Sequence, residues 1–333
     1  MTGPAISVAM SVYNGERFLP EAIESVLDQT FSDFEFLIVD DGSGDATASI
    51  LRDYEARDSR VRAIVRENRG LVASLNELLS CASAPIIARM DADDICRPER
   101  FDRQFAFLTN NPDHGVVGSW SEDIGEDGAP LFRTGDDHPL THEDVLSAIA
   151  QGRHVICHPA AMFRREVVLS VGGYHAAFRH CEDYDLWLRL ASVTKLANLP
   201  ERLLRYRRYD GQVSTRHATE QQIGTAVAQL AWQERQAGRP DPTACLSHLP
   251  AIDELDALFG KEGISRRVGE QVALALIYSA AAMRGQGFDL LVQHLRDGGR
   301  RHGMWRTVLR LLRFGEPARA LRLAMTLAAA PAR

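Results

Sequence analysis

The chain has 333 residues, of which 45% are hydrophobic and 25% charged, so it has the composition of a folded globular protein. Its length fits about two domains, and the formal net charge of −7 disfavours a nucleic-acid partner bound by overall basic charge. Residues 300–333 hold eight Arg and one Glu, which is +7, so residues 1–299 carry −14 and the basic charge is concentrated in the tail.

Cysteine spacing and the N-terminus indicate the compartment. Five cysteines, an odd number, lie without paired spacings, which is typical of a reducing compartment. The N-terminus lacks a charged segment before a long apolar stretch, and no run reaches the roughly 18 apolar residues of a spanning helix. We therefore expect a cytoplasmic protein.

The first hundred residues alternate between β-prone runs and helical periodicity. The patterns predict strands at 6–12, 34–39, 61–65 and 85–90 and helices at 16–29, 47–56 and 71–81. Strands joined by helical crossovers form right-handed βαβ units, so we expect an α/β fold with a mainly parallel, helix-covered sheet. Ligands of such sheets bind beyond the carboxyl ends of the strands.

The regularity weakens after about residue 110. Short strands are expected at 115–119, 130–134 and 160–163, and helices at 143–150 and 182–191, which predicts a mixed, partly antiparallel extension of the sheet. A break at Asp210-Gly211 is the candidate domain boundary, and the patterns beyond about residue 215 are mostly helical.

Three carboxylates, Asp91, Asp93 and Asp94, directly follow the strand expected at 85–90. Converging carboxylates repel one another unless a cation or a donor compensates. Oxygen ligands without nearby Cys or His suit Mg²⁺ or Mn²⁺, whose shells are often completed by phosphate oxygens. The alternative is a solvated acidic loop that caps the helix beginning near Pro98.

Two further acidic pairs lie at element ends. Asp40 and Asp41 follow the strand at 34–39 and either form a turn with an N-cap or accept a hydrogen bond from a base or ribose. Glu182 and Asp183 begin a helix and either cap it or provide a general base. His158, before a proline, is expected in a pocket wall or the core. G-x-G-x-x-G after the first strand and G-x-x-x-x-G-K-[ST] are both missing from the sequence, which disfavours dinucleotide oxidoreductases and P-loop hydrolases.

Together these residues resemble the family 2 glycosyltransferases, the large inverting family with the GT-A fold. The matching segments occur in the family's order and spacing: 7–14, Glu16, 39–43, 67–70 with Asn76, 88–94, 158–159, 162–165, 172–174, 182–187 and 204–207. The match covers about residues 5–214. It implies a GT-A domain at 1–214, with a nucleotide-sugar-binding half at 1–110 and an acceptor half at 111–214, followed by a helical region at 215–333.

The resemblance implies a role for each matched site residue. The base and ribose of a nucleotide-sugar donor would lie among Tyr13, Asn14, Glu16, Asp40, Asp41 and Arg69. Asp40 is the expected base contact, although the adjacent Asp41 is not separated from it. Asp91 and Asp93 match a D-x-D pair that holds Mg²⁺ or Mn²⁺, with Asp91 closer to the ribose or sugar. Asp183 matches the general base, and Glu182 would orient it or contact the acceptor.

The implied function is inverting transfer of a sugar from a nucleotide-diphosphate donor, a UDP-sugar, to a hydroxyl of a saccharide or lipid-linked acceptor in bacterial surface-polysaccharide synthesis. Two alternatives stay open. A sugar nucleotidyltransferase should open with a Gly-rich phosphate loop, and residues 11–15 are not one. A non-catalytic, membrane-associated binding subunit would keep the fold without turnover.

Two features depart from the match or lie beyond it. Several relatives carry a metal-ligating His where this chain has Tyr209, so His217 would substitute, or Arg207 or Arg208 would hold the diphosphate. In the tail, apolar and basic side chains can occupy opposite faces of one helix: Met304, Trp305, Val308, Leu309 and Leu312 against Arg306, Arg310 and Arg313.

After that helix, Gly315 interrupts and Pro317 suits the start of a second helix with the same pattern. Such a helix either packs on its own domain with a solvated Arg face or lies on an anionic membrane. Because many relatives use lipid-linked acceptors, we expect peripheral membrane contact through residues 300–333, at the inner face of the cell membrane.

Overall fold

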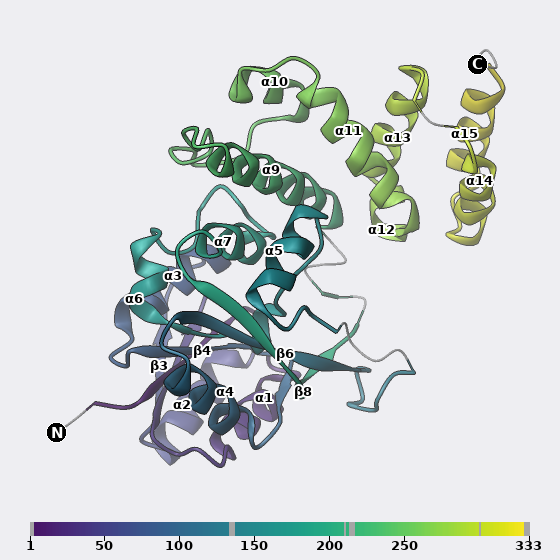
Figure 1. Ribbon diagram of the computed structural model, residues 1–333. Helices are drawn as coiled ribbons and strands as arrows, with labels where there is room; N and C mark the ends of the chain where they lie inside the picture. The colour runs from purple at the N-terminus through teal and green to yellow at the C-terminus, as the bar shows by residue number, and fades with distance from the viewer. Residues whose placement is uncertain (1–2, 133–136, 210, 213–216, 300, 330–333) are drawn as a thin grey trace. The chain divides into compact units, whose positions relative to one another are not determined.

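The computed structural model describes residues 3–132, 137–209, 211–212, 217–299 and 301–329. The chain divides into two compact units. Met1–Ala176 and Glu182–Tyr209 form the first, here called the sheet unit, and Ala177–Cys181 and Asp210–Arg333 form the second, here called the helical unit (Figure 1).

The sheet unit is built on a mixed sheet. Among the described residues it has eight strands in the order β3-β2-β1-β4-β7-β6-β8-β5. Their bounds are β1 Ile6–Val12, β2 Phe34–Asp40, β3 Val61–Val65, β4 Ile86–Asp91, β5 Ile95–Cys96, β6 His114–Ile124, β7 Met162–Arg164 and β8 Lys195–Arg207. The first four strands in this order are parallel, and β7 runs antiparallel to both β4 and β6. The mixed, partly antiparallel extension is therefore confirmed.

Helices accompany the strands of this unit. Their bounds are α1 Leu19–Leu27, α2 Thr47–Arg57, α3 Leu71–Cys81, α4 Arg100–Asn110, α5 His142–Ala150, α6 Arg165–Ser170 and α7 Glu182–Leu190. Alternate residues of a strand point to one face of a sheet. Accordingly Ile6, Val8 and Met10 share a core with side chains of α1, α2 and α4. Residues of the opposite face, such as Leu37 and Val39, are also fully buried.

The expected elements of the first hundred residues are confirmed, with one clear shift. The helix expected at 16–29 begins only at Leu19, because Asn14 has a positive φ of 51° and residues 15–18 form turns ahead of Pro20. The strand expected at 130–134 is wrong in its described part, since Pro130 forms only an isolated bridge with Ile124. Residues 133 and 134 lie outside the described residues.

Strand β8 has no counterpart among the expected strands. Its sequence contains Pro200 and several charged residues, which hide the alternation of a typical strand. It pairs with β6 through register shifts and on its other side with the two-residue β5. A strand so close to the sheet edge tolerates proline and charge.

The helical unit contains the remaining helices. Their bounds are α9 Ala218–Gln236, α10 Leu255–Phe259, α11 Ile264–Ala275, α12 Ala280–Met283, α13 Gln286–Arg296, α14 Met304–Arg313 and α15 Pro317–Ala329. Gly315 adopts a φ of 75° after α14, and Pro317 opens α15, as the sequence predicted. In the part of the chain that the structure describes, every helix falls short of the length and apolar character that crossing a bilayer requires.

Candidate active site

Loops from three parallel strands meet at one edge of the sheet. Val12 of β1 pairs with Asp40 of β2, and Ser11 pairs with Asp91 of β4. Because the strands are parallel, the residues that follow them leave the sheet side by side. The structure thereby brings together the loop at 13–16, the Asp40-Asp41 pair and the carboxylates at 91–94.

The first loop is joined to the second by hydrogen bonds. The backbone N–H of Asn14 donates to Ser43 Oγ at 2.8 Å, and the Asn14 side-chain oxygen accepts from the Gly44 N–H at 2.8 Å. The Glu16 carboxylate accepts from the Ala46 N–H at 2.9 Å. Two of the predicted donor-binding side chains therefore hold the loops to each other. Tyr13 stays 57% exposed, so its ring is free to stack on a base.

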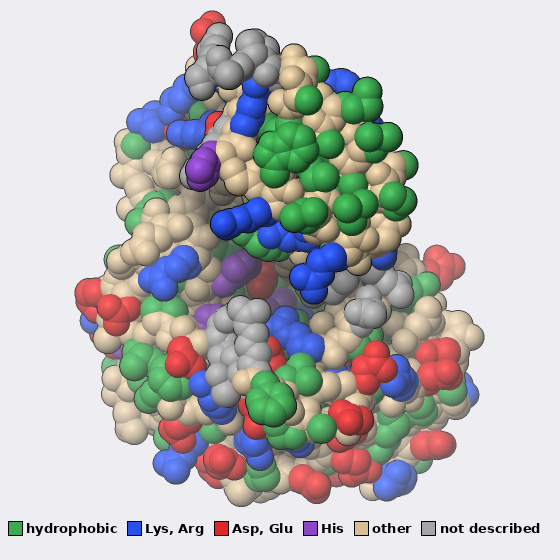
Figure 2. Space-filling model, turned by 90° about the vertical axis from the view of Figure 1, so that its right-hand side faces the viewer, with side chains coloured by type: hydrophobic (Ala, Val, Ile, Leu, Met, Phe, Trp, Pro, Cys, Tyr) green, Lys and Arg blue, Asp and Glu red, His purple; other side chains and the backbone are tan. Residues whose placement is uncertain are grey.

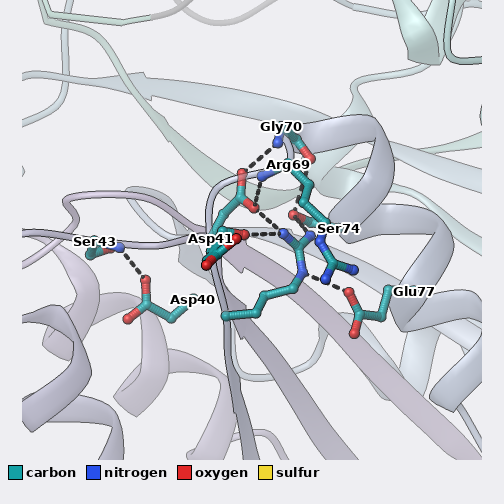
Figure 3. Close-up of polar contacts among 9 residues, drawn as sticks. Asp40, Asp41, Ser43, Arg69, Gly70, Ser74 and Glu77 are labelled. Carbon is teal, nitrogen blue, oxygen red and sulfur yellow. Dashed lines mark hydrogen bonds and ion pairs between the residues drawn. The ribbon is translucent and has the colours of Figure 1, made fainter.

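Asp40 and Asp41 differ sharply in their surroundings (Figure 3). Both Asp41 oxygens are engaged: Arg66 donates to one of them, and the N–H groups of Arg69 and Gly70 donate at 2.9 and 2.8 Å. Asp40 accepts a single bond, from the Ser43 N–H at 2.9 Å, and its Oδ2 is buried without a hydrogen-bond partner. Asp40 thus has an acceptor oxygen to offer a ligand, whereas Asp41 holds the loop that precedes α3.

The turn after this pair requires glycine. Gly42 has a φ of 81°, and a Cβ there would lie 2.6 Å from the backbone nitrogen of Asn68. Arg66, which the sequence analysis did not identify, donates through Nε to Glu77 at 2.7 Å and is 9% exposed. The Arg69 guanidinium, by contrast, is exposed, and only its backbone contacts Asp41. A short run of charged residues after a strand gave no signal that Arg66 would turn inward.

The carboxylates after β4 form a tight cluster. Asp91, Asp93 and Asp94 each place an oxygen within 4.8 Å of the others. Asp91 also pairs with Arg89 at 2.5 Å, and Asp94 accepts from the Arg207 N–H at 2.9 Å. The second oxygen of Asp94 is buried and has no hydrogen-bond partner.

Burial and mutual repulsion raise the pKa values of Asp93 and Asp94 in this cluster. Desolvation and, as the second largest cause, the charge of Asp91 raise the pKa of Asp93 to about 6. Desolvation and the charges of Asp93 and Asp91 likewise raise the pKa of Asp94 well above its ordinary value. Close oxygen ligands, an unpartnered buried oxygen and uncompensated negative charge are the properties that suit a hard divalent cation. The residues therefore fit Mg²⁺ or Mn²⁺.

Tyr209 stands where relatives carry a metal-ligating His, and three other residues were considered in place of that His. The four residues have different surroundings. The Tyr209 hydroxyl donates to Asp93 Oδ2 at 2.9 Å. Arg207 is fully buried and donates to the carbonyl oxygens of Asp93, Gly125 and Glu126, so it ties β8 to the acidic loop. Arg208 pairs with Asp123 at 3.2 Å and stays 44% exposed. His217 lies in the helical unit, where its ring stacks on His180 at 3.9 Å. Of the two arginines, only Arg208 keeps an exposed side chain.

The first turn of α7 presents two carboxylates of different character. Glu182 is 4% exposed, and its Oε2 is buried without a hydrogen-bond partner, whereas Asp183 is partly exposed. Desolvation and the neighbouring Asp183 charge raise the pKa of Glu182 to about 8. Desolvation also raises the pKa of Asp183, but His154 and backbone N–H groups counteract it. Glu182 therefore keeps its proton up to about pH 8, and Asp183 is the more accessible carboxylate of the pair.

Arg89 connects this pair electrostatically to the acidic cluster. It is 3% exposed, and its charge acts on Asp93, Glu182 and Asp183. Burial by itself would lower the pKa of Arg89, but the ion pair with Asp91 outweighs it and raises that pKa. A buried cation among carboxylates from β4 and α7 shows that these elements share one site. Arg89 lies in the matched segment 88–94, but the resemblance implied no such role for it.

Aromatic residues form the wall behind these charges. His158 is buried, its Nε2 lies 2.9 Å from the Tyr174 hydroxyl, and its ring meets Trp187 edge-on at 6.0 Å. Desolvation and Arg89 lower the pKa of His158 well below its ordinary range, so the imidazole is neutral. The Asn76 side chain and the Tyr174 backbone exchange two hydrogen bonds, at 2.8 and 2.9 Å. His158 is thus a core residue, one of the two predicted placements.

The sequence matches a family model and is similar to the sequences of named proteins. The family model described as Glycosyl transferase family 2 matches residues 7–172. The chain is 35% identical over 207 residues to the O-antigen biosynthesis glycosyltransferase WbnJ of Escherichia coli, covering 61% of this chain and 79% of WbnJ. It is 31% identical over 192 residues to the UDP-Gal:alpha-D-GlcNAc-diphosphoundecaprenol beta-1,3-galactosyltransferase of Escherichia coli, covering 56% and 67% of the two chains.

Solved structures share the fold at low identity. TarS of S. aureus, residues 1–349 in complex with UDP-GlcNAc, is 16% identical with a TM-score of 0.55, covering 97% of this chain and 91% of that one. Mannosyltransferase PcManGT of Pyrobaculum calidifontis, in complex with GDP-Man and Mn²⁺, is 17% identical with a TM-score of 0.51, covering 98% and 88%. The fold is of the GT-A type, with a helical C-terminal region, and the chain belongs to glycosyl transferase family 2.

Proposed function

We propose that the protein is an inverting glycosyltransferase that moves a sugar from a UDP-sugar to a hydroxyl group of an acceptor. The observation that carries this proposal is the pairing, in the first turn of α7, of a partly exposed Asp183 with a buried Glu182 whose pKa is raised to about 8. In such a pair the accessible carboxylate, Asp183, would be the proton acceptor. Arg89 is the shared electrostatic neighbour of this pair and of the acidic cluster.

The donor would be bound at the strand ends. The exposed ring of Tyr13 would stack on the base, and the unpartnered Oδ2 of Asp40 would accept a hydrogen bond from the base or the ribose. The exposed guanidinium of Arg69 is available to phosphate oxygens. Asn14, Glu16 and Asp41 would shape this site through the loop contacts that they make. The UDP named with the galactosyltransferase and TarS supports a UDP-sugar.

Asp93 and Asp91 would hold a Mg²⁺ or Mn²⁺ ion, with Asp94 beside them. A divalent cation bound there supplies positive charge against the diphosphate as it leaves. Neighbouring residues hold the two carboxylates of that site in place. Tyr209 fixes one Asp93 oxygen, and Arg89 fixes Asp91. Arg208, exposed and next to Tyr209, is a second cation available to the phosphates.

The transfer step would be a single displacement. Asp183 would take the proton of the acceptor hydroxyl while that oxygen forms a bond to the anomeric carbon. The bond from the anomeric carbon to the diphosphate oxygen breaks, the nucleoside diphosphate leaves with the electron pair, and the anomeric configuration inverts. Glu182, protonated near neutral pH, would keep the second negative charge away from Asp183 and contact the acceptor or orient the base.

The acceptor would be a saccharide or a lipid-linked saccharide in bacterial surface-polysaccharide synthesis. The names of the O-antigen enzyme WbnJ and of the diphosphoundecaprenol-linked galactosyltransferase support this class. An enzyme with a lipid-linked acceptor would act in the cytoplasm at the inner face of the membrane. Membership of family 2 disfavours the sugar nucleotidyltransferase considered above.

The test is the stereochemistry of the product. The purified protein would be incubated with Mn²⁺, a panel of UDP-sugars and GDP-mannose, and simple saccharide acceptors, and the new linkage would be assigned by NMR. We expect turnover of a UDP-sugar with inversion at the anomeric carbon. Retention of configuration would contradict the role of Asp183, and turnover of GDP-mannose alone would contradict the donor. Binding of donor without any turnover, by comparison with an active relative, would favour a non-catalytic binding subunit.

A further inference from the structure

An apolar surface is exposed on the last two helices of the helical unit. On α14, Trp305, Leu309 and Leu312 are 56%, 64% and 51% exposed, and on α15 Leu321 and Met325 are both 63% exposed. Figure 2 shows hydrophobic side chains gathered on this side of the unit. Single exposed apolar residues are ordinary, but a contiguous group of large ones marks an interaction surface.

This apolar surface is separate from the faces that hold the two helices in place. Met304, Thr307 and Leu311 of α14 are buried, as are Ala320 and Leu323 of α15. These residues face the interior of their own unit. The five exposed side chains therefore lie outside its internal packing.

Arginines lie beside the apolar surface. At 100° per residue, Arg306 and Arg313 follow directly around α14 from Leu309, and both are exposed. A groove of about 590 Å³ adjoins α15. It is lined by Leu321 and Met325, by Arg296 and Arg301, and by Arg322, which also pairs with Asp289 at 3.1 Å. Guanidinium groups next to apolar side chains match a phosphate head group with its hydrocarbon chain.

We propose that the apolar surface and its arginines dock the protein on an anionic phospholipid bilayer, with α14 and α15 lying in the plane of the interface. A second copy of this chain is a poorer occupant, because a symmetric contact would bring arginines against arginines. Neither helix contains an acid, and Glu316, which lies between them, is already paired with Arg284 and Arg319 at 3.4 Å. Docking on a bilayer would explain how the protein stays at the inner face of the membrane, where its proposed acceptor lies. The docking itself does not depend on sugar transfer.

The test is flotation of the full chain with vesicles, without donor or acceptor. Phosphatidylcholine vesicles with phosphatidylglycerol should carry the protein, and high salt should release it. Pure phosphatidylcholine should bind at least about tenfold less protein. The double substitution of Leu309→Gln with Leu312→Gln, and separately that of Arg306→Gln with Arg313→Gln, should each reduce binding by about tenfold or more.

Matched controls lie in the sheet unit. Val193 is 59% exposed and Arg62 is exposed, so Val193→Gln and Arg62→Gln repeat the same chemical changes away from the apolar surface and should bind vesicles like the wild type. Unchanged midpoints of thermal unfolding would show that the variants are folded. Trp305 emission should shift to shorter wavelength on anionic vesicles, and Trp305→Phe should lose that shift.

Equal binding to neutral vesicles, or undiminished binding by the Leu309 and Leu312 variant, would overturn the proposal. A concentration-dependent dimer that the same variant abolishes, without vesicle binding by the wild type, would assign the surface to a second copy. Because the assay contains no sugar nucleotide, its failure is distinguishable from a failure of the proposed transferase function.

Discussion

The Tyr209 hydroxyl donates a hydrogen bond to Asp93 Oδ2 at 2.9 Å. Tyr209 also packs on Phe18, with ring centroids 5.2 Å apart, so its side chain is held from two sides. One oxygen of the carboxylate proposed to bind the metal is thus fixed by a phenol that follows β8. Tyr209 is a positioning residue, because it acts through Asp93.

Replacing Tyr209 by Phe should therefore weaken the metal-dependent step. A hydrogen bond to a charged group is worth about 1.5–3 kcal/mol, which corresponds to roughly a tenfold or greater rise in the Mn²⁺ concentration needed for half-maximal activity. Tyr54→Phe is the matched control, since it removes the same group from a bond to Glu24 at 2.8 Å outside the site. An unchanged Mn²⁺ requirement in Tyr209→Phe would show that this bond does not position Asp93 for the ion.

Substitutions at Asp40 and Asp41 should have opposite consequences. Asp41→Asn removes the charge that pairs with the nearly buried Arg66, which should cost about 3 kcal/mol of the free energy of unfolding. Asp40→Asn should leave the free energy of unfolding within about 1 kcal/mol of the wild type, because its Oδ2 has no internal partner, yet weaken binding of UDP. Urea denaturation and calorimetric titration with UDP measure the two effects. The reverse pattern would exchange the roles assigned to the pair.

Glu182 should make stability depend on pH. Its pKa is raised from 4.5 to about 8, so the folded state holds this proton more tightly than the unfolded state does. The resulting stabilisation is complete below about pH 4.5 and is lost as the pH rises through about 8. Glu182→Gln, which cannot ionise, should abolish this component, on the order of a few kcal/mol between pH 5 and 8.

Urea denaturation of the wild type and of Glu182→Gln across that range would measure the difference. Glu166→Gln, on α6, is a suitable control for the loss of a carboxylate near the surface. If the two unfolding free energies run parallel from pH 5 to 8, Glu182 does not hold a proton in the folded protein.

Much of the sheet unit could be predicted from the sequence because local patterns of apolar residues determine its strands and helices. Apolar alternation and helical spacing in the first hundred residues specify β1 to β4 with their helices, and parallel pairing then brings the carboxylates at 40–41 and 91–94 to one edge. Strand β8 could not be predicted, since Pro200 and its charged side chains obscure the alternation, and its pairing with the distant β6 stabilises it.

The different roles of neighbouring residues within the site also depend on residues distant in the sequence. Asp40 and Asp41 are equivalent in the sequence, and the inward turn of Arg66 after β3, with the N–H groups of Arg69 and Gly70, distinguishes them. Similarly, Arg207 and Arg208 both suit a phosphate, but the carbonyl oxygens of three other residues bind the first of them in the interior. The apolar residues of α14 share one face as predicted, yet packing divides that face into a buried part and an exposed part.

The most direct test of the account is single-turnover sugar transfer by Asp183→Asn beside the wild type, with donor binding measured on the same samples. Asp183 is proposed to accept the proton of the acceptor, so the variant should bind the UDP-sugar normally and transfer it about 10²–10⁴-fold more slowly. Asp53→Asn, an exposed residue of α2, should transfer at the wild-type rate. Wild-type transfer by Asp183→Asn, with donor binding intact, would contradict the assignment of the general base and with it the proposed mechanism.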